Sequence, residues 1–247
     1  MNDKTDVLIL KQTDYKENDV ILHVLSKEYG KLSFIAKGLK KTTSKNAYAC
    51  QLFSYSTFVF DFKEQSTLQL LKTASVIESY RALRENLFKL SAVSVCAEII
   101  TQLVDVTVEH FDVYKSTLDR MVGETDVSFY ALNLFLSTIL NLEGSAPFVD
   151  GCVECGRESG IISIGVGEGG FVCKDCNMQK RLPMYNFEDL QGFRYIAKCQ
   201  FSQYDILKEQ TVTNSFYLTR TQVSFLNVHC GISCRSFRFL ENYIQTI

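Results

Sequence analysis

The chain has 247 residues, of which 46% are apolar and 22% are charged. This is an ordinary globular composition, long enough for one large domain or two small ones, and it excludes a low-complexity chain. The net charge of −2 gives no argument for nucleic-acid binding by itself. The N-terminus has no basic stretch followed by an apolar one, so no secretory signal is visible.

The N-terminal third of the chain predicts β-structure. Apolar runs and alternating patterns indicate five short strands, at residues 7–10, 20–25, 32–36, 53–60 and 67–74. A single longer connection, residues 37–51, joins the third strand to the fourth. This strand count and this connection favour a small closed barrel of the OB type. An open five-stranded sheet and an SH3-like barrel remain as alternatives.

Lysines gather in and around the long connection. Residues 27–45 contain six lysines against one acid, Glu28. Their ammonium groups, with the Ser and Thr hydroxyls of the loop, suit phosphate oxygens, and Gly38 lets a backbone approach closely. The DNA-binding residues predicted on this basis are Lys11, Lys31, Lys37, Lys40, Lys41 and Lys45. The alternative is a solvated loop that binds nothing.

Aromatic residues lie on the strands beside this loop. They are Tyr29, Phe34, Phe53, Tyr55 and Phe58. An OB barrel can bind single strands by stacking bases on such side chains next to a basic groove. The simpler interpretation, which we favour for most of them, is that they fill the barrel.

From residue 80 the apolar spacing changes to steps of three and four, which is typical of amphipathic helices. The predicted helices are residues 83–104, 111–121, 129–140, 187–198, 219–230 and 233–244. Gly144 and Pro147 end the third of them. The fold class is therefore α+β: an N-terminal OB barrel at residues 1–79 and an α-helical domain at 80–247, with a cysteine-rich ribbon inserted at about 150–180.

Two Cys-x-x-Cys pairs, Cys152 with Cys155 and Cys173 with Cys176, stand seventeen residues apart. This spacing predicts one structural Zn²⁺ held by four thiolates, a closed site that cannot activate water. Four reduced cysteines without a metal are one alternative. A thioredoxin-type redox pair is another, and we disfavour it because one pair would suffice and neither is expected to follow a strand and open a helix.

The residues around the pairs predict a zinc ribbon. Residues 161–166 and 171–172 indicate two strands joined by a Gly-rich turn. Gly156 and Asn177 each follow the second cysteine of a pair, where a positive φ is expected. We interpret the other five cysteines as reduced thiols of a cytosolic protein. They are Cys50, Cys96, Cys199, Cys230 and Cys234.

The sequence predicts no catalytic site. The histidines, His23, His110 and His229, have no metal-ligand spacing. No His-x-Glu precedes the cysteine pairs, so a zinc deaminase is unsupported. A phosphate-binding loop and a dinucleotide fingerprint are also missing from the sequence. We therefore predict a protein that is not an enzyme.

Taken together, these segments resemble the RecO family of bacterial recombination mediators. The similarity runs in order through the opening Leu10-Lys11-Gln12-Thr13-Asp14-Tyr15-Lys16-Glu17-Asn18-Asp19, then Ala36-Lys37-Gly38, Gln51-Leu52-Phe53, the cysteine pairs and Ser236-Phe237-Arg238-Phe239-Leu240. It covers nearly the whole chain. The segment 44–48 departs from the family by being less basic.

The resemblance implies an OB domain, a helical domain and, as in many members, a zinc ribbon. It implies a cytoplasmic, nucleoid-associated bacterial protein that binds single- and double-stranded DNA and anneals complementary strands. Such proteins help to load the RecA recombinase onto DNA coated by single-strand-binding protein, together with RecR and sometimes RecF. The groove for the acidic C-terminal tail of single-strand-binding protein lies in the helical domain of the family. Its position on this sequence is not assigned; Arg220, Arg235 and Arg238 are candidates, and the alternative is that each pairs with an acid of its own domain.

Two hypotheses of different classes follow. In the first, the chain is a DNA-binding recombination mediator whose lysine loop holds phosphates. In the second, it is an interaction adaptor whose OB domain binds protein, with the ribbon as a rigid docking surface. The basic helices near the C-terminus are an alternative location for DNA. A zinc hydrolase or redox enzyme is a third hypothesis that no arranged base or nucleophile supports.

Overall fold

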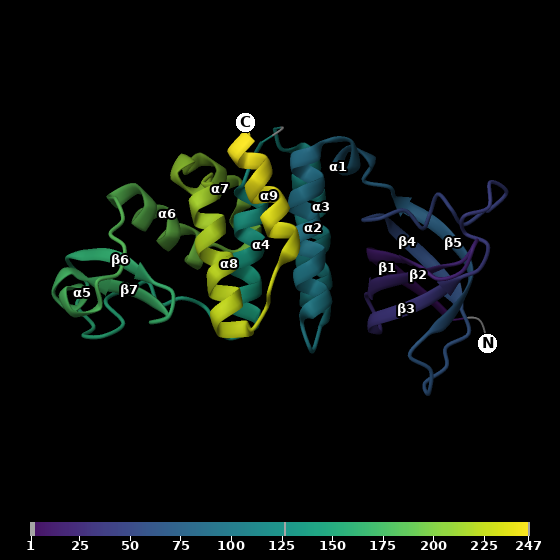
Figure 1. The fold of residues 1–247 in the computed structure, drawn as a ribbon, viewed down its shortest axis with the longest axis horizontal. Coiled ribbons are helices and arrows are strands. Elements are labelled where there is room, and N and C mark those ends of the chain that lie inside the picture. Colours follow the sequence, from purple (N-terminus) through teal and green to yellow (C-terminus); the bar gives the residue numbers. More distant parts are fainter. Residues whose placement is uncertain (1–2, 126, 247) are drawn as a thin grey trace. The chain divides into compact units, whose positions relative to one another are not determined.

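A computed structural model describes residues 3–125 and 127–246 of the chain. They form two compact units, residues 1–123 with 235–247 and residues 124–234 (Figure 1). The boundary predicted at residue 79 lies inside the first unit, between its barrel and its helices. The helices predicted as one domain are shared between both units. The predicted domain limits at residues 1 and 247 fall outside the described residues.

The N-terminal strands close into a barrel. The strands are β1 (Asp3–Asp14), β2 (Val20–Ser26), β3 (Gly30–Ala36), β4 (Tyr55–Phe60) and β5 (Gln69–Glu78). Their order around the barrel is β1-β2-β3-β5-β4, and β1 also pairs with β4. The β3–β5 pair is parallel and the other pairs are antiparallel. This confirms the predicted five-stranded OB barrel.

Three aromatic rings fill the barrel. Phe34 is fully buried and packs edge-to-face on Phe58 and Phe60, with ring centroids 5.2 and 4.9 Å apart. Phe53 is also buried, so three of the five aromatics considered above belong to the core as favoured. Tyr29 keeps 37% of its surface exposed.

Helices complete the first unit. They are α1 (Arg81–Glu85), α2 (Leu87–Gln102), α3 (Val108–Gly123) and α9 (Arg235–Thr246). The single helix predicted at 83–104 is wrong in one respect, because it breaks at Asn86. The backbone of Asn86 is extended and its side chain accepts the N–H of Lys89, so it ends α1 and caps α2.

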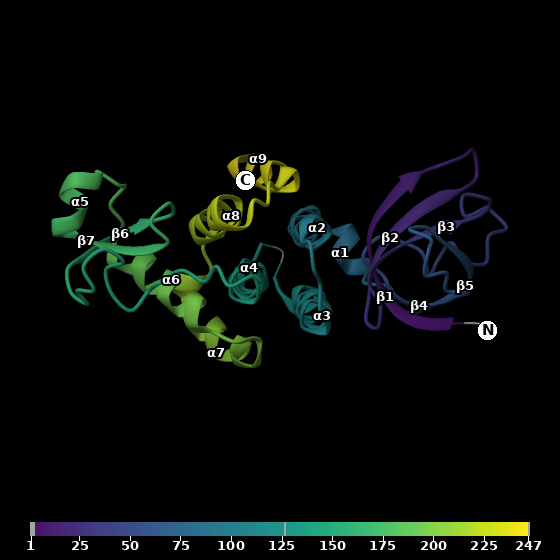
Figure 2. The ribbon, with the colours of Figure 1, turned by 90° about the horizontal axis from the view of Figure 1, so that it is seen from below.

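Figures 1 and 2 show α2 and α3 side by side, with α9 joining them from the far end of the sequence. The backbone N–H of Ser236 donates to the Glu98 carboxylate of α2 at 2.7 Å. This contact ties the C-terminal helix to the N-terminal half of the chain.

The second unit consists of helices and a two-stranded ribbon. Its elements are α4 (Tyr130–Leu142), β6 (Ile161–Gly165), β7 (Gly170–Cys173), α5 (Lys174–Lys180), α6 (Phe187–Lys198), α7 (Tyr204–Glu209) and α8 (Phe216–Cys230). The predicted α4, α6, α8 and ribbon strands are confirmed, whereas α5 and α7 were not predicted. Asn133, fully buried in α4, links α4 to α8 and to the segment before it. Its amide nitrogen donates to the carbonyls of Thr213 and Ser215, and its amide oxygen accepts from the Thr219 hydroxyl of α8.

Within residues 3–125 and 127–246, no helix combines the length and the hydropathy that a membrane span requires.

The barrel core supplies a first testable prediction. Changing Phe34→Ala removes the ring that packs on Phe58 and Phe60, and we expect the barrel to lose about 3–5 kcal/mol of unfolding free energy. Tyr48→Ala is the matched control, because Tyr48 is 57% exposed and should change stability by less than about 0.5 kcal/mol. Urea unfolding followed by circular dichroism measures both. Equal shifts in the two variants would contradict this description of the core.

Candidate metal centre and nucleic-acid interface

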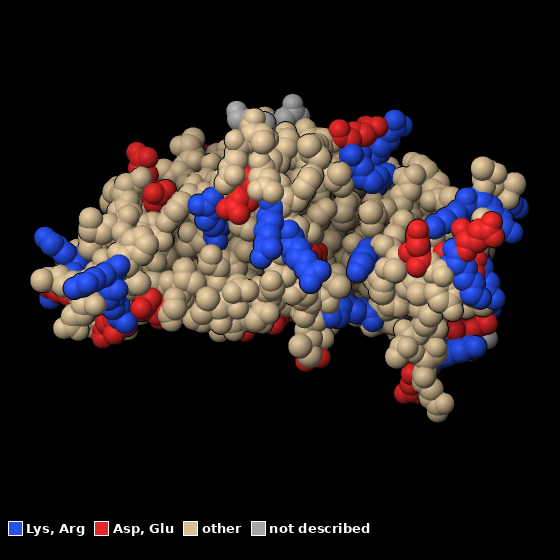
Figure 3. Space-filling model, in the orientation of Figure 1, with Lys and Arg blue, Asp and Glu red and all other residues tan. Residues whose placement is uncertain are grey.

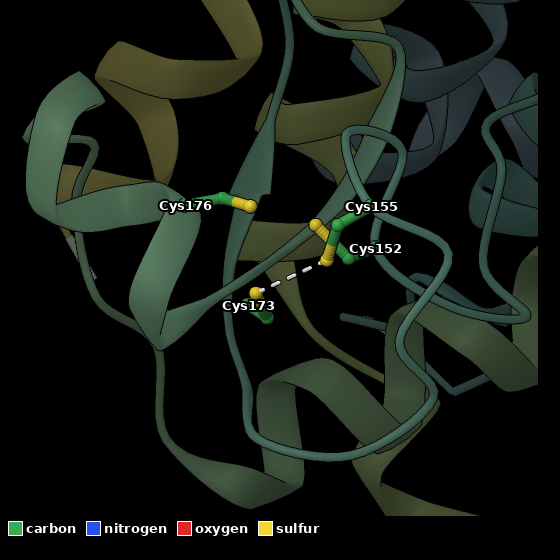
Figure 4. Close-up of side chains that lie close together, drawn as sticks. All are labelled: Cys152, Cys155, Cys173 and Cys176. Atoms are coloured by element: carbon green, nitrogen blue, oxygen red, sulfur yellow. Dashed lines mark hydrogen bonds between the residues drawn. The ribbon is translucent and has the colours of Figure 1, made fainter.

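The four cysteines of the two pairs converge on one point of the ribbon (Figure 4). All four sulfurs lie within 4.8 Å of one another, and the Sγ atoms of Cys155 and Cys173 are 3.7 Å apart. Among the described residues, this is the group of His, Cys, Asp and Glu side chains that is close enough to hold a metal ion. Four convergent thiols can therefore bind one metal.

Local backbone geometry produces this convergence. The N–H of Gly156 donates to the Cys152 carbonyl at 2.8 Å, and Gly156 has a φ of 74°, so the first pair turns as predicted. Cys173 is the last residue of β7, and Cys176 lies one turn into α5. The hairpin thus delivers one sulfur and the helix that follows delivers another.

Two expectations about the second pair are wrong. Asn177 does not have a positive φ, because α5 continues through it; Arg181 takes that conformation, with φ 56°, at the helix end. The buried Asn177 side chain instead bonds both the N–H and the carbonyl of Leu182, at 2.8 and 3.1 Å. The pair also follows a strand and opens a helix, so that argument against a redox pair fails. The approach of four sulfurs to one point is the observation that favours a metal site.

The surroundings of the thiols affect their ionisation. Burial opposes ionisation of Cys152, but backbone hydrogen bonds from Cys173, Cys155 and Glu154 outweigh it and lower the pKa of the Cys152 thiol to about 6. Hydrogen bonds to Cys155 and Cys173 raise the pKa of Cys176 to about 12. Ionisation of Cys152 is thus favoured before a cation is present, whereas ionisation of Cys176 is opposed until a positive charge lies beside it.

A small apolar cluster, backbone hydrogen bonds and ion pairs join the two cysteine pairs. The buried cluster around the pairs is small and consists of Cys152, Val172 and Cys173, while Ile164 and Phe171 of the hairpin are buried as well. Two ion pairs link the two cysteine pairs: Arg157 with Asp175, which is more than half exposed, and Lys180 with Glu154, which is about one-third exposed. Exposed ion pairs contribute roughly 0–1 kcal/mol each. So small a cluster is typical of modules in which a bound metal contributes to folding.

The predicted lysine loop is exposed and braced. The side chains of Lys37, Lys40, Lys41 and Lys45 are exposed on the connection between β3 and β4. Figure 3 shows blue side chains over the barrel, with acidic ones among them.

The loop rests on the β1–β2 turn. Gly38, with φ 64°, donates its N–H to the Asp19 carboxylate at 2.8 Å. Lys40 donates its N–H to the Asn18 carbonyl at 3.1 Å, and its ammonium group pairs with Asp14 at 2.7 Å. The loop is therefore positioned before any ligand arrives, and one of its charges is partly neutralised.

Lys31 and Lys11 occupy different environments. The Lys31 ammonium group donates to the carbonyls of Thr101, at 3.1 Å, and of Leu103, where it meets the negative end of the α2 dipole. Burial lowers the pKa of Lys31. The structure thus gives Lys31 a helix-capping contact that no local sequence pattern could reveal, since its partners lie some seventy residues away. Lys11 is exposed on β1 beside His23 of β2.

A hollow that was not predicted lies on the outer face of β2 and β3. It has a volume of about 540 Å³ and is covered on one side by the β4–β5 connection. Residues of its floor and rim include His23, Lys31, Ser33, Phe62, Gln65 and Thr67. The sequence signal that points to it is the polar pair His23 and Ser33, which face outward at opposed positions of neighbouring strands.

These features define a class of protein: an OB-barrel protein with a braced basic loop, a helical domain and a four-cysteine ribbon. Comparison with known protein families supports this description. The model for the N-terminal part of recombination protein O matches residues 1–80, and the model for its C-terminal part matches residues 84–222. The chain belongs to the recombination protein O family.

Curated relatives cover the chain almost completely. It is 29% identical to the DNA repair protein RecO of Bacillus pumilus, over 96% of this chain and 93% of that relative. It is 28% identical to the DNA repair proteins RecO of Bacillus cytotoxicus and Bacillus mycoides, over 98% of this chain and 97% of each relative.

The ribbon geometry yields a second prediction. Changing Cys152 and Cys173 to Ser removes two buried ligands, and we expect the chain to lose its bound metal and about 5–10 °C of Tm. Elemental analysis of the purified protein and thermal unfolding measure the two effects. Cys199→Ser, outside the cluster, is the control and should change neither. A metal content that survives the double change would refute the assignment of the ligands.

Proposed function

We propose that the chain is a non-enzymatic DNA-binding recombination mediator that acts in DNA repair. In this role it anneals complementary strands and helps to load a recombinase onto DNA coated by single-strand-binding protein. Family membership over nearly the whole chain, together with a closed OB barrel that carries an exposed basic loop, supports this proposal. We place its action in the bacterial cytoplasm.

The barrel supplies the proposed DNA contact. Lys37, Lys40, Lys41 and Lys45 can neutralise phosphates, and Lys11 extends the positive charge onto β1. The pair between Lys40 and Asp14 leaves 38% and 81% of those side chains exposed, so an approaching phosphate can replace the carboxylate. Single strands are the favoured ligand because OB barrels combine a basic groove with stacking surfaces. Double strands are held through the same phosphate contacts.

The metal that we assign to the ribbon is one Zn²⁺ ion. A tetrahedral site with zinc–sulfur bonds of about 2.3 Å places its sulfurs about 3.8 Å apart. The 3.7 Å between the Cys155 and Cys173 sulfurs fits that value. Four thiolate ligands leave no open position, so Cys152, Cys155, Cys173 and Cys176 serve folding and no reaction.

The proposed protein partners are RecR and single-strand-binding protein, with RecF and RecA engaged through the shared assembly. Helix α6 carries a surface that suits the acidic tail of single-strand-binding protein. A hollow of about 390 Å³ is lined there by Gln191, Arg194, Tyr195 and Lys198. Both cations already share Asp150, at 3.2 Å from Arg194, which shows that they accept a carboxylate.

A salt series tests the DNA site. Changing Lys37, Lys40 and Lys41 together to Ala should weaken single-strand binding. It should also make the slope of log affinity against log salt concentration less negative by about two, because each of the three lost phosphate contacts contributes about −0.7 to that slope. Changing Lys115, Lys174 and Lys208 removes the same charge elsewhere and should leave the slope unchanged. An unaltered slope in the first variant would move DNA to the basic C-terminal helices. Absence of binding by the native, zinc-loaded chain would favour the adaptor.

A charge reversal tests the α6 surface. Arg194→Glu should reduce the affinity for a peptide that copies the acidic tail by about tenfold, since it opposes a carboxylate where a guanidinium stood. Fluorescence anisotropy of the labelled peptide measures this. Lys208→Glu, on α7, is the control with the same change of charge. Equal loss in both variants would show a general effect of charge and no defined groove.

A further inference from the structure

The C-terminal helix α9 turns an exposed, basic face to solvent. Its residues Phe237 and Leu240 are buried, and the helix packs on α2 through that side. The exposed residues of α9 recur at steps of three and four, so they share the opposite side of the helix. This α9 face consists of Arg235, Arg238, Phe239, Asn242, Gln245 and Thr246. It contains no acid, and Glu241, the one acid within Arg235–Thr246, is half-buried at its side.

The two guanidinium groups of the α9 face are not neutralised. Within residues 3–125 and 127–246, neither Arg235 nor Arg238 forms an ion pair with a carboxylate. Other exposed cations do, as Arg81 does with Glu85 at 2.6 Å. Figure 3 shows blue side chains over α9. Because arginine is always charged and presents a fork of donors that matches a phosphate, this face suits an anionic ligand.

An aromatic ring lies between the cations and narrows the choice of ligand. The Phe239 side chain is 53% exposed, one turn after Arg235 and next to Arg238. A single strand uses both features, since its phosphates meet the cations and one of its bases stacks on the ring. An acidic peptide uses only the cations. A duplex keeps its bases stacked inside, so it also leaves the ring unused. The α9 face therefore fits a single strand best.

Helix α2 connects the α9 face to the barrel. The backbone N–H of Ser236 donates to the Glu98 carboxylate at 2.7 Å. Three residues further along α2, about 4.5 Å of helix rise, the Thr101 carbonyl accepts from the Lys31 ammonium group of β3 at 3.1 Å. The barrel and α9 thus contact α2 within one helical turn of each other, inside one compact unit.

We propose that the α9 face binds a second single strand of DNA while the lysine loop of the barrel holds the first. The inference rests on the proposed function, strand annealing, and adds the site of the second strand to it. Arg235 and Arg238 contact neighbouring phosphates, and Phe239 stacks on a base. Two strands of like charge repel each other in solution, and cationic sites on one compact unit offset that repulsion and raise the local concentration of each strand.

The test counts the strands that the full, metal-loaded chain binds. The probe is labelled oligothymidylate of about 10 nucleotides, which does not pair with itself and falls within the length that one OB fold covers. We expect two strands per native chain and one per chain of the double variant Arg235→Ala, Arg238→Ala. The rate at which the double variant anneals complementary strands should fall about tenfold, because two phosphate contacts are lost. Its affinity for the first strand should not change.

Two further variants serve as controls. Arg81→Ala with Arg181→Ala removes two exposed arginines outside the α9 face and should leave two strands bound. Phe239→Ala keeps both charges and truncates an exposed ring, so it should not affect folding. It should weaken binding of the second oligothymidylate strand about tenfold and leave binding of an abasic strand unchanged.

Several results would overturn the inference while DNA binding by the barrel stands. They are one strand per native chain, two strands and native annealing in the Arg235→Ala, Arg238→Ala chain, and equal losses in that chain and the arginine control. A double variant that keeps both strands but loses affinity for an acidic peptide would also overturn it, because the α9 face would then bind protein. If the native chain binds no strand, the proposed function fails and the inference fails with it.

Discussion

The closure of the barrel is the constraint on which the rest of the first unit depends. β3 meets β5 in a short parallel ladder, Phe34 opposite Gln69 and Ile35 opposite Leu70. This ladder places the fully buried Phe34 ring in the core and the buried Gln69 amide beneath the β4–β5 connection. The same few residues therefore close the barrel, fill it and fix the wall of the outer hollow. The lysine loop depends on closure as well, because it starts where β3 ends.

The ribbon obeys a separate constraint. The buried cluster around its cysteine pairs is small, and the ion pairs that link them are at least partly exposed. The four cysteines can bind a metal there, and the metal that we propose would add to the folding free energy of the ribbon. A site in which all four ligands are thiolates has no open coordination position, which is why we propose a structural role for it. The mediator role that we propose requires well-placed cations and surfaces and does not require a reactive centre.

Local signals in the sequence predicted most of the fold, and long-range contacts were what they missed. Strand alternation, helical spacing and the cysteine spacing each involve neighbouring residues, and they predicted the barrel, the ribbon strands and most of the helices, but not the break at Asn86, α5 or α7. Lys31 was assigned to DNA from its neighbours in the chain, yet it meets carbonyls at the end of α2. The roles of Asn86 and Asn177 were also predicted wrongly. The Asn86 side chain caps α2, and the Asn177 side chain bonds Leu182 just beyond α5. Apolar spacing indicates neither contact. The hollow beside His23 could be identified only after the pairing of β2 with β3 was known.

Photo-crosslinking tests the central claim, that the lysine loop of the barrel binds DNA, most directly. A single strand containing 4-thiothymidine would be bound to the full, metal-loaded chain, irradiated, and the attached peptides identified by mass spectrometry. This account predicts attachment within residues 37–45 and 235–246. Attachment confined to residues 124–234 would contradict it, because the DNA would then lie on the second unit.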